Sequence, residues 1–306
     1  MERYYKKWFT LLTLPAIVVF GMVVVIPFIF GVLYSFTGWR GTYFVQIVDG
    51  VTQKVDHFWQ AFVGLRNYAN AFRIEEFKEA MLYTLEFTII AIVMINVVSL
   101  LMALLVTKIN RFSAVFRGIY FLPNLLGGLT LGFIWSFIYE IVFSKILFGP
   151  EGLIHIEALC YMTQDSTKNL FALAFLAVWQ MAGYMMMIYI NGLNNIPKDI
   201  YEAASIDGST GAHTFFKITV PMLMPSITIV FFLTLANCFK MLDQNVALTN
   251  GNFNTRLLAL QILNTTQDYT PPNYGLAQAQ AVIFFVLIAA VSLVQLSITK
   301  KREVEA

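Results

Sequence analysis

The apolar positions of this chain fall into long runs that carry no Asp, Glu, Lys or Arg. A hydrocarbon core about 30 Å thick takes roughly 20 helical residues to cross, and a charge at its centre costs about 2.5–3.5 kcal/mol. The runs are long enough, and they lack the alternation of barrel strands, as segment 284–291 illustrates. We therefore predict an all-α polytopic membrane protein with six transmembrane helices, at residues 10–37, 82–107, 117–139, 170–193, 221–240 and 276–299.

The connections between these helices differ in charge. One set carries an excess of basic residues and comprises residues 1–7, 107–117, 196–220 and 300–306. It holds 11 basic and 6 acidic residues, a balance of +5, whereas the rest of the chain holds 9 basic and 12 acidic residues, a balance of −3. Because basic residues accumulate on the cytoplasmic side, both termini and a loop at 194–220 are expected there. The outer loops are then expected at residues 38–81, 140–169 and 241–275.

The composition agrees with a membrane protein. Of 306 residues, 58% are apolar and 12% are charged, and the mean hydropathy is +0.69, whereas about 25% of a typical soluble domain is charged. The first apolar run is too long for a signal peptide and lacks a small-residue cleavage site, so an uncleaved helix is expected. The net charge of +2 gives no reason to expect a nucleic-acid partner.

Several classes of chemistry lack their sequence signatures. The chain has no nucleotide-binding P-loop, no H-E-x-x-H, no paired cysteine ligands and no G-x-S-x-G. We therefore expect no catalytic residue, no metal site and no cofactor bound by this chain. Cys160 and Cys238 lack framework spacing, and we interpret them as unrelated thiols. The predicted spans hold essentially no ionisable residue, which argues against an ion-driven carrier or a voltage-gated channel.

The most informative segment is the polar loop between the fourth and fifth predicted helices. Pro197 suits the first turn of a helix, and Glu202 follows near the positive end of that helix. Ala203 and Ala204 favour helix and have small side chains, and Gly208 suits the position after a helix end. A second short helix is expected to start at residue 209 or 210. The loop is therefore predicted to form two short helices with a fixed bend, a shape suited to docking in a groove of another protein.

The spacing within this loop is specific. Glu202-Ala203-Ala204 is followed after three residues by Gly208 and after nine more by Ile218-x-Val220-Pro221. This pattern resembles the EAA signature of ABC importer permeases, in which leucine is usual at the position of Val220. The flanking Ile196-Pro197, Tyr201 and Asp207-Gly208 are similar to the carbohydrate-uptake branch of that family. Weaker patches in the expected order, at 63–68, Pro123 and 274–277, extend the resemblance over most of the chain.

The resemblance implies that the loop docks into a cleft of a separate ATPase and passes its movement to the membrane helices. Glu202 would supply a charge contact, Ala203 and Ala204 a close approach, and Gly208 the bend. The residues expected in this coupling role are Tyr201, Glu202, Ala203, Ala204, Asp207, Gly208, Ile218 and Pro221. The implied partners are a homologous second permease, two copies of an ABC ATPase that bind ATP and magnesium, an extracellular sugar-binding protein and the lipid of a bacterial cell membrane.

Polar and aromatic residues inside the predicted spans are the candidates for a translocation pathway, because sugars offer hydroxyls to amides and C–H faces to aromatic rings. They are Asn96, Trp135, Trp179, Gln180, Tyr184 and Asn237. Gln180 and Tyr184 are four residues apart and share one helix face. Each candidate can equally serve as an interfacial anchor or an interhelical hydrogen bond. Gly128-x-x-x-Gly132 favours close helix packing, with a thin pathway wall as the alternative.

Together these features indicate the permease subunit of an ATP-driven bacterial importer for a sugar or oligosaccharide, not an enzyme. An ABC permease for a different small polar solute stays open, although phosphate, polyamine or peptide would require charged groups that the spans lack. A stand-alone channel or carrier would have no use for the bent loop. The sequence does not name the sugar, which depends on the binding protein and on scattered pathway residues.

Overall fold

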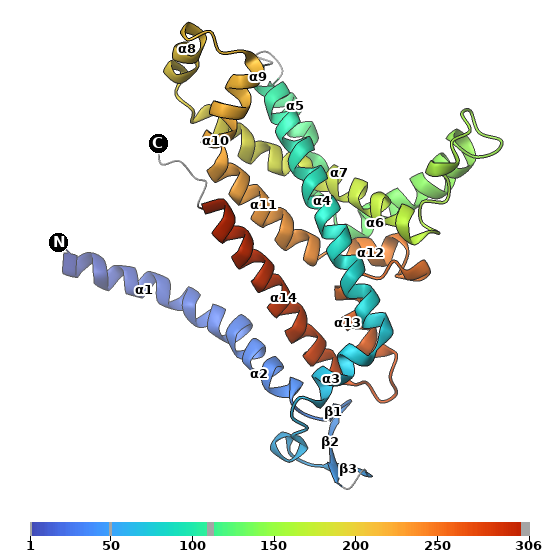
Figure 1. The fold of residues 1–306 in the computed structure, drawn as a ribbon. Coiled ribbons are helices and arrows are strands. Elements are labelled where there is room, and N and C mark those ends of the chain that lie inside the picture. Colours follow the sequence, from blue (N-terminus) through green and yellow to red (C-terminus); the bar gives the residue numbers. More distant parts are fainter. Residues whose placement is uncertain (1, 49–50, 109–112, 301–306) are drawn as a thin grey trace. The chain divides into compact units, whose positions relative to one another are not determined.

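The computed structural model describes residues 2–48, 51–108 and 113–300 of a mainly helical chain (Figure 1). The chain divides into two units, one made of residues 1–75 with 262–286 and one made of residues 76–261 with 287–306. Arg111, Lys301 and Arg302, which contribute to the predicted basic side, lie outside the described residues.

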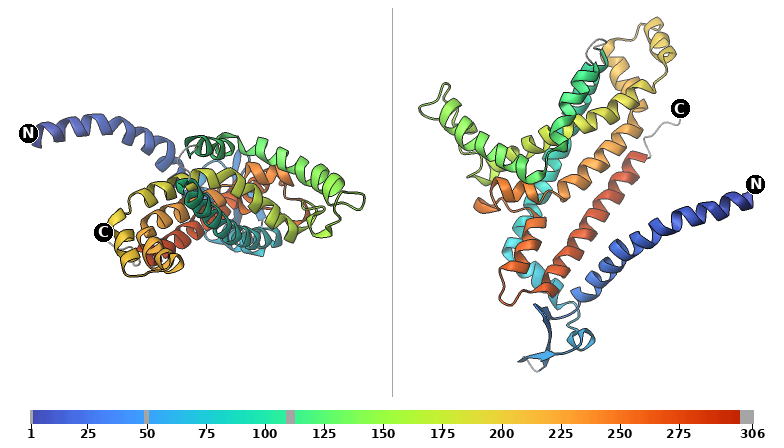
Figure 2. Two further views of the ribbon diagram at one scale, coloured as in Figure 1. Left: turned by 90° about the horizontal axis from the view of Figure 1, so that it is seen from above. Right: turned by 180° about the vertical axis from the view of Figure 1, so that it is seen from behind.

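The first unit begins with a long curved helix that is visible in all views (Figures 1 and 2). It consists of α1 (Glu2–Phe20), a π-helical turn (Gly21–Val25) and α2 (Ile26–Ser35), which follow one another directly. Pro27 lies in the first turn of α2, and a proline cannot donate the backbone hydrogen bond of a regular helix. The widened turn before it accommodates this missing donor.

A small antiparallel sheet follows, in the segment predicted as an outer loop. Its strands, in the order β1-β2-β3, are Trp39–Arg40, Tyr43–Val48 and Val51–Val55. Trp39 pairs with Phe44, and Phe44 pairs in turn with Val55. The expectation of an all-α protein is therefore wrong for this segment. Its β-branched and aromatic residues are strand formers. Arg40 and Lys54 interrupt the apolar positions, so the segment does not resemble a membrane span.

Hydrogen bonds and aromatic contacts hold the first unit together. The side chain of Asn67, on α3 (Arg66–Arg73), donates to the backbone carbonyls of Ser35 at 2.8 Å and Thr37 at 2.9 Å. The backbone of Gly275 approaches the Thr37 carbonyl so closely that a Cβ atom would collide with it. The ring of Trp39 lies 4.8 Å from that of Tyr274. The end of α2 is thus fixed to the start of α14 (Tyr274–Lys300).

The second unit contains most of the membrane helices and the loop between the fourth and fifth of them. Its helices are α4 (Glu75–Lys108), α5 (Ser113–Phe121), α6 (Gly128–Phe137), α7 (Ser166–Asn194), α8 (Lys198–Ile206), α9 (Gly211–Thr214), α10 (Val220–Met222), α11 (Met224–Phe239), α12 (Asp243–Leu248) and the start of α13 (Leu258–Gln267). Shorter 3-10 and π-helical turns lie at Phe58–Ala61 of the first unit and, in the second, at Leu122–Leu125, Ile138–Leu147, Glu157–Leu159, Phe215–Thr219 and Asn252–Asn254.

Two of the predicted spans are interrupted. The run predicted at 117–139 breaks after α5, where a 3-10 turn contains Pro123, and helix resumes at Gly128. The fifth run bends by 68° between Gly211–Met222 and Met224–Phe239. Prolines at 221 and 225 flank this bend, and each removes a backbone donor.

Five helices in the described part of the chain are long and apolar enough to cross a membrane, or six if the bent pair forms one span. This agrees with a polytopic membrane protein. The two cysteines, Cys160 and Cys238, are both buried and both free, which confirms that they are unrelated thiols.

Glycines allow the helices of the second unit to pack closely. A Cβ atom at Gly183 of α7 would overlap the backbone carbonyl of Tyr120 on α5, and one at Gly192 would overlap the Ser226 hydroxyl on α11. Small residues at such crossings let helix backbones approach each other in the membrane. The views of Figure 2 show α7 and α11 side by side, in agreement with their many contacts.

Candidate functional site

The loop between α7 and α11 contains the two short helices expected from its sequence. Pro197 precedes α8 as its N-cap, and Gly208 follows it with a backbone φ of +72°. The amide of Ser209 donates to the carbonyl of Ala204 at 2.9 Å and closes the end of the helix. The Thr210 hydroxyl then caps α9 by accepting from the amide of His213 at 3.4 Å. Local signals in the sequence therefore set both helix boundaries.

One face of this loop presents small and apolar side chains to its surroundings. Glu202 and Ala203 are exposed, whereas Ala204 is buried. Ile206 is 86% exposed and Phe216 is 67% exposed. Exposed apolar side chains that form a contiguous patch are typical of protein interaction sites. Ile206 is not among the coupling residues expected from the sequence, although a lone isoleucine among polar neighbours is a usable signal.

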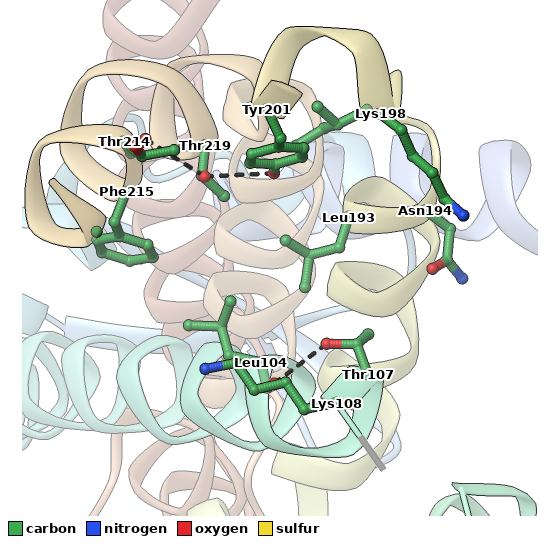
Figure 3. Close-up of a pocket in the computed structure, with 12 residues that line it drawn as sticks. Leu104, Thr107, Lys108, Leu193, Asn194, Lys198, Tyr201, Thr214, Phe215 and Thr219 are labelled. Atoms are coloured by element: carbon green, nitrogen blue, oxygen red, sulfur yellow. Dashed lines mark hydrogen bonds between the residues drawn. The ribbon is translucent and has the colours of Figure 1, made fainter. Parts of the chain in front are cut away.

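The remaining loop residues tie this face to the membrane helices. The hydroxyl groups of Tyr201 and Thr219 are 3.3 Å apart, and Thr219 also donates to the Thr214 carbonyl at 3.4 Å (Figure 3). Ile218 is half-buried and Asp207 is exposed. Pro221 lies in α10, next to the bend that begins α11. The loop thus leads into α11 across a 68° bend, and one hydroxyl contact joins α8 to the segment before this bend.

A second feature is a cavity of about 280 Å³ among α7, α11, α12 and the break after α5. It brings together three of the predicted pathway residues, Gln180, Tyr184 and Asn237. Gln180 and Tyr184 share one face of α7, as their spacing predicts. Met181 and Met241 supply adaptable apolar surface. No carboxylate lines this cavity in the part of the chain that the structure describes.

Three polar residues of the cavity were missed by sequence analysis: Asn124, Lys240 and Gln244. The Gln244 amide donates to Oε1 of Gln180 at 2.8 Å and joins α12 to α7. None of the three lies in the interior of an observed helix: Asn124 is in the break after α5, Lys240 is the C-cap of α11, and Gln244 is in the first turn of α12. Pro123 could have indicated Asn124, because broken helices in membranes occur where the backbone is buried in protein or lines a water-filled cavity.

Gly128 and Gly132 explain how α12 reaches this cavity. A Cβ atom at Gly132 would overlap the side chain of Ala247 on α12, and one at Gly128 would lie 2.8 Å from Cβ of Asp243. The prediction of close helix packing by these glycines is confirmed. Their packing places Gln244 opposite Gln180.

The other pathway candidates lie elsewhere. Asn96 of α4 accepts a hydrogen bond from the Tyr189 hydroxyl at 2.7 Å and donates to the Ile92 carbonyl at 2.8 Å. It therefore occupies an interhelical hydrogen bond. Trp135 and Trp179 form an edge-to-face pair with centroids 5.8 Å apart, and neither lines the cavity.

A metal site finds no support in the geometry. Among residues 2–48, 51–108 and 113–300, no three His, Cys, Asp or Glu side chains gather where they could hold an ion. What the described residues offer instead is a polar cavity around Gln180 and a loop with exposed apolar side chains.

Comparison with known proteins gives matches over most of this chain. Residues 85–304 match the family model of the binding-protein-dependent transport system inner membrane component. The probable starch degradation products transport system permease protein AmyD of Thermoanaerobacterium thermosulfurigenes is 37% identical over 99% of this chain and 98% of its own. The multiple sugar-binding transport system permease protein MsmF of Streptococcus mutans is 31% identical over 99% of this chain and 98% of its own.

The fold also matches a solved structure, that of a bacterial ABC transporter involved in the import of the acidic polysaccharide alginate. The TM-score is 0.74 with 98% of each chain covered, and the sequence identity is 16%. The full-length sequence relatives and the family match lead to one conclusion: the chain belongs to the family of inner-membrane components of binding-protein-dependent transport systems.

Proposed function

We propose that this chain is the permease subunit of an ATP-driven importer that carries a sugar or oligosaccharide delivered by an extracellular solute-binding protein. As a member of its family it is a transport subunit of the membrane and not an enzyme. The observation that carries the choice of a sugar is the amide-rich cavity around Gln180, which no described carboxylate lines and to which Lys240 adds one ammonium group, in a chain 37% identical to a probable permease for starch degradation products.

The chemistry of this cavity suits saccharide hydroxyls. Each amide side chain offers both donors and an acceptor, and the Tyr184 hydroxyl can do either. The Lys240 ammonium adds donors only. The bond between Gln180 and Gln244 keeps these groups paired, and a sugar hydroxyl can replace it with bonds to both amides. Six of the eight lining residues carry polar groups, and Met181 and Met241 supply the apolar surface.

The orientation of the chain is part of the proposal. Taken together, the N-terminal segment, 107–117, 196–220 and the C-terminus hold 11 basic and 6 acidic residues, which supports a cytoplasmic location for both termini and for the loop. The loop then lies on the side of the membrane where ATP is available.

The loop 194–220 is proposed to couple ATP hydrolysis to transport. Two copies of an ABC ATPase, which bind magnesium and ATP, and a homologous second permease would complete the transporter. Ala203, Ile206 and Phe216 present the exposed apolar surface that a cleft of the ATPase would cover. Because α9, the π-helical turn and α10 lead into α11 across a single bend of 68°, movement of the docked loop would reorient α11 and its end at the cavity.

The direct test is reconstitution of the whole transporter with its binding protein in proteoliposomes. Starch-derived oligosaccharides are the first substrates to try, given the relative named above. We expect labelled saccharide to accumulate only with ATP on the side of the loop. Uptake without any ATPase, or no uptake of saccharides but uptake of another small polar solute, would contradict the proposal.

Substitution of the amide pair tests the cavity. In Gln180→Leu or Gln244→Leu, the remaining amide loses its hydrogen-bond partner, and a bound sugar hydroxyl keeps only one of its two amide ligands. A buried polar group left without its partner costs about 1–3 kcal/mol. The apparent affinity for saccharide during uptake should fall by roughly 5- to 150-fold. Asn191→Leu is the matched control, because Asn191 is an exposed amide of α7 outside the cavity. Equal uptake kinetics in all three variants would remove the cavity from the pathway.

A further inference from the structure

A larger cavity, of about 670 Å³, lies beneath the loop in the second unit. Its walls come from the ends of α4 and α7, from α8 and from the segment around α9 (Figure 3). The volume falls in the range of small-molecule sites, about 300–1,000 Å³. It is separate from the cavity around Gln180, with which it shares no lining residue.

The lining has an apolar floor and a basic rim. Leu104, Leu193 and Phe215 supply apolar surface. Lys108, from the last turn of α4, and Lys198, from the first turn of α8, bring a positive charge from two different elements. Neither lysine forms an ion pair with another residue in the described ranges, and no described carboxylate lines the cavity. The acidic residues of α8, Asp199 and Glu202, are exposed outside it.

We propose that this cavity binds the phosphate headgroup and upper acyl chains of an anionic phospholipid. Lys108 and Lys198 follow the apolar runs of α4 and α7 closely in the sequence, and basic pockets between membrane helices on the cytoplasmic side recruit anionic headgroups. The apolar floor favours a lipid over a soluble phosphate. Because Lys198 belongs to the loop and Lys108 to a membrane helix, one bound lipid contacts both and restrains the movement of α8. This regulatory role rests on the proposed coupling function of the loop, whereas lipid binding itself does not.

Lipid binding is tested on the complete transporter without nucleotide, in nanodiscs of phosphatidylcholine with or without phosphatidylglycerol. Native mass spectrometry after partial delipidation would count the lipids that are retained. We expect retention of phosphatidylglycerol in preference to phosphatidylcholine. Each lysine near a lipid surface contributes about a factor of five in affinity, so the double variant Lys108→Gln/Lys198→Gln should bind roughly thirty-fold more weakly. Lys217→Gln, an exposed lysine of the same loop outside the cavity, should behave as the unmodified protein.

A steric variant and a soluble competitor complete the test. Leu193→Phe should lower lipid retention without changing the charge of the cavity. This variant replaces the double lysine variant in the test if the latter does not assemble. Glycerol 3-phosphate should not displace the lipid at equal concentration. Equal retention of both lipids, equal loss in Lys217→Gln, or full competition by glycerol 3-phosphate would overturn the assignment. Backbone hydrogen exchange of residues 198–219 should become slower with phosphatidylglycerol, even in a transporter that carries no sugar. This measurement therefore tests the lipid site independently of the proposed transport function.

Discussion

Replacement of Gly208 by leucine is expected to abolish ATP-coupled uptake while the protein still inserts and assembles. Gly208 has a φ of +72°, a region that costs a residue with a Cβ atom about 1–2 kcal/mol. A Cβ atom at this position would have no other atom within 4 Å, so the effect comes from the backbone and not from a collision. Relaxation to negative φ would re-aim α8 relative to α9 and misplace the docking surface.

Two variants of the loop separate this explanation from general damage. Gly211→Leu also adds a side chain in open space, but without a positive φ, and should retain uptake. Gly208→Asn should retain most of it, because asparagine adopts the left-handed conformation more readily. Uptake and ATP hydrolysis are measured together in proteoliposomes at matched protein content. Normal uptake by Gly208→Leu would refute the coupling role of this bend.

Replacement of Gly183 by valine is expected to destabilise the fold of the second unit. The first side-chain atom would overlap the Tyr120 carbonyl and lie 3.0 Å from the backbone nitrogen of Phe121. Overpacking of a close contact costs about 1–3 kcal/mol, and more where the neighbour is backbone that cannot move aside. The loss would appear as a lower thermal midpoint in detergent and a lower yield of purified protein.

The matched control is Gly118→Val on the facing helix α5. A Cβ atom there meets no other atom within 4 Å, so stability should change little. Because Gly183 lies between Gln180 and Tyr184 on α7, surviving Gly183→Val protein should also show impaired uptake. Equal thermal stability of the two variants would mean that α5 and α7 do not cross at this glycine.

The parts of the fold that depend on local sequence could be predicted. The charge-free run at 170–193 corresponds to α7, Ser166–Asn194, and Asp165 begins this helix by accepting from the amide of Lys168 at 2.8 Å. Pro197 and Gly208 mark the two ends of α8 in the same way. Helix caps and apolar length act within a few residues or along one segment, so the sequence alone displays them.

Features that depend on distant segments could not be predicted. Strands β1 to β3 require pairing partners, and α12 is a short helix stabilised by the glycines of α6. Asn96 and Gln180 are both amides in predicted spans, yet the first bonds Tyr189 and the second bonds Gln244. Nothing in either residue's neighbourhood distinguishes these outcomes.

The sequence by itself determined which segments suit the membrane, where the loop bends and which permease family the EAA spacing resembles, because these follow from apolar length, charge and local backbone preference. Only the tertiary structure decided that Gln180, Tyr184 and Asn237 share one cavity with Asn124, Lys240 and Gln244. Helical periodicity shows which residues share a face. Which helix that face meets depends on how closely backbones can approach, and here the contacts of Gly132 and Gly183 set that approach.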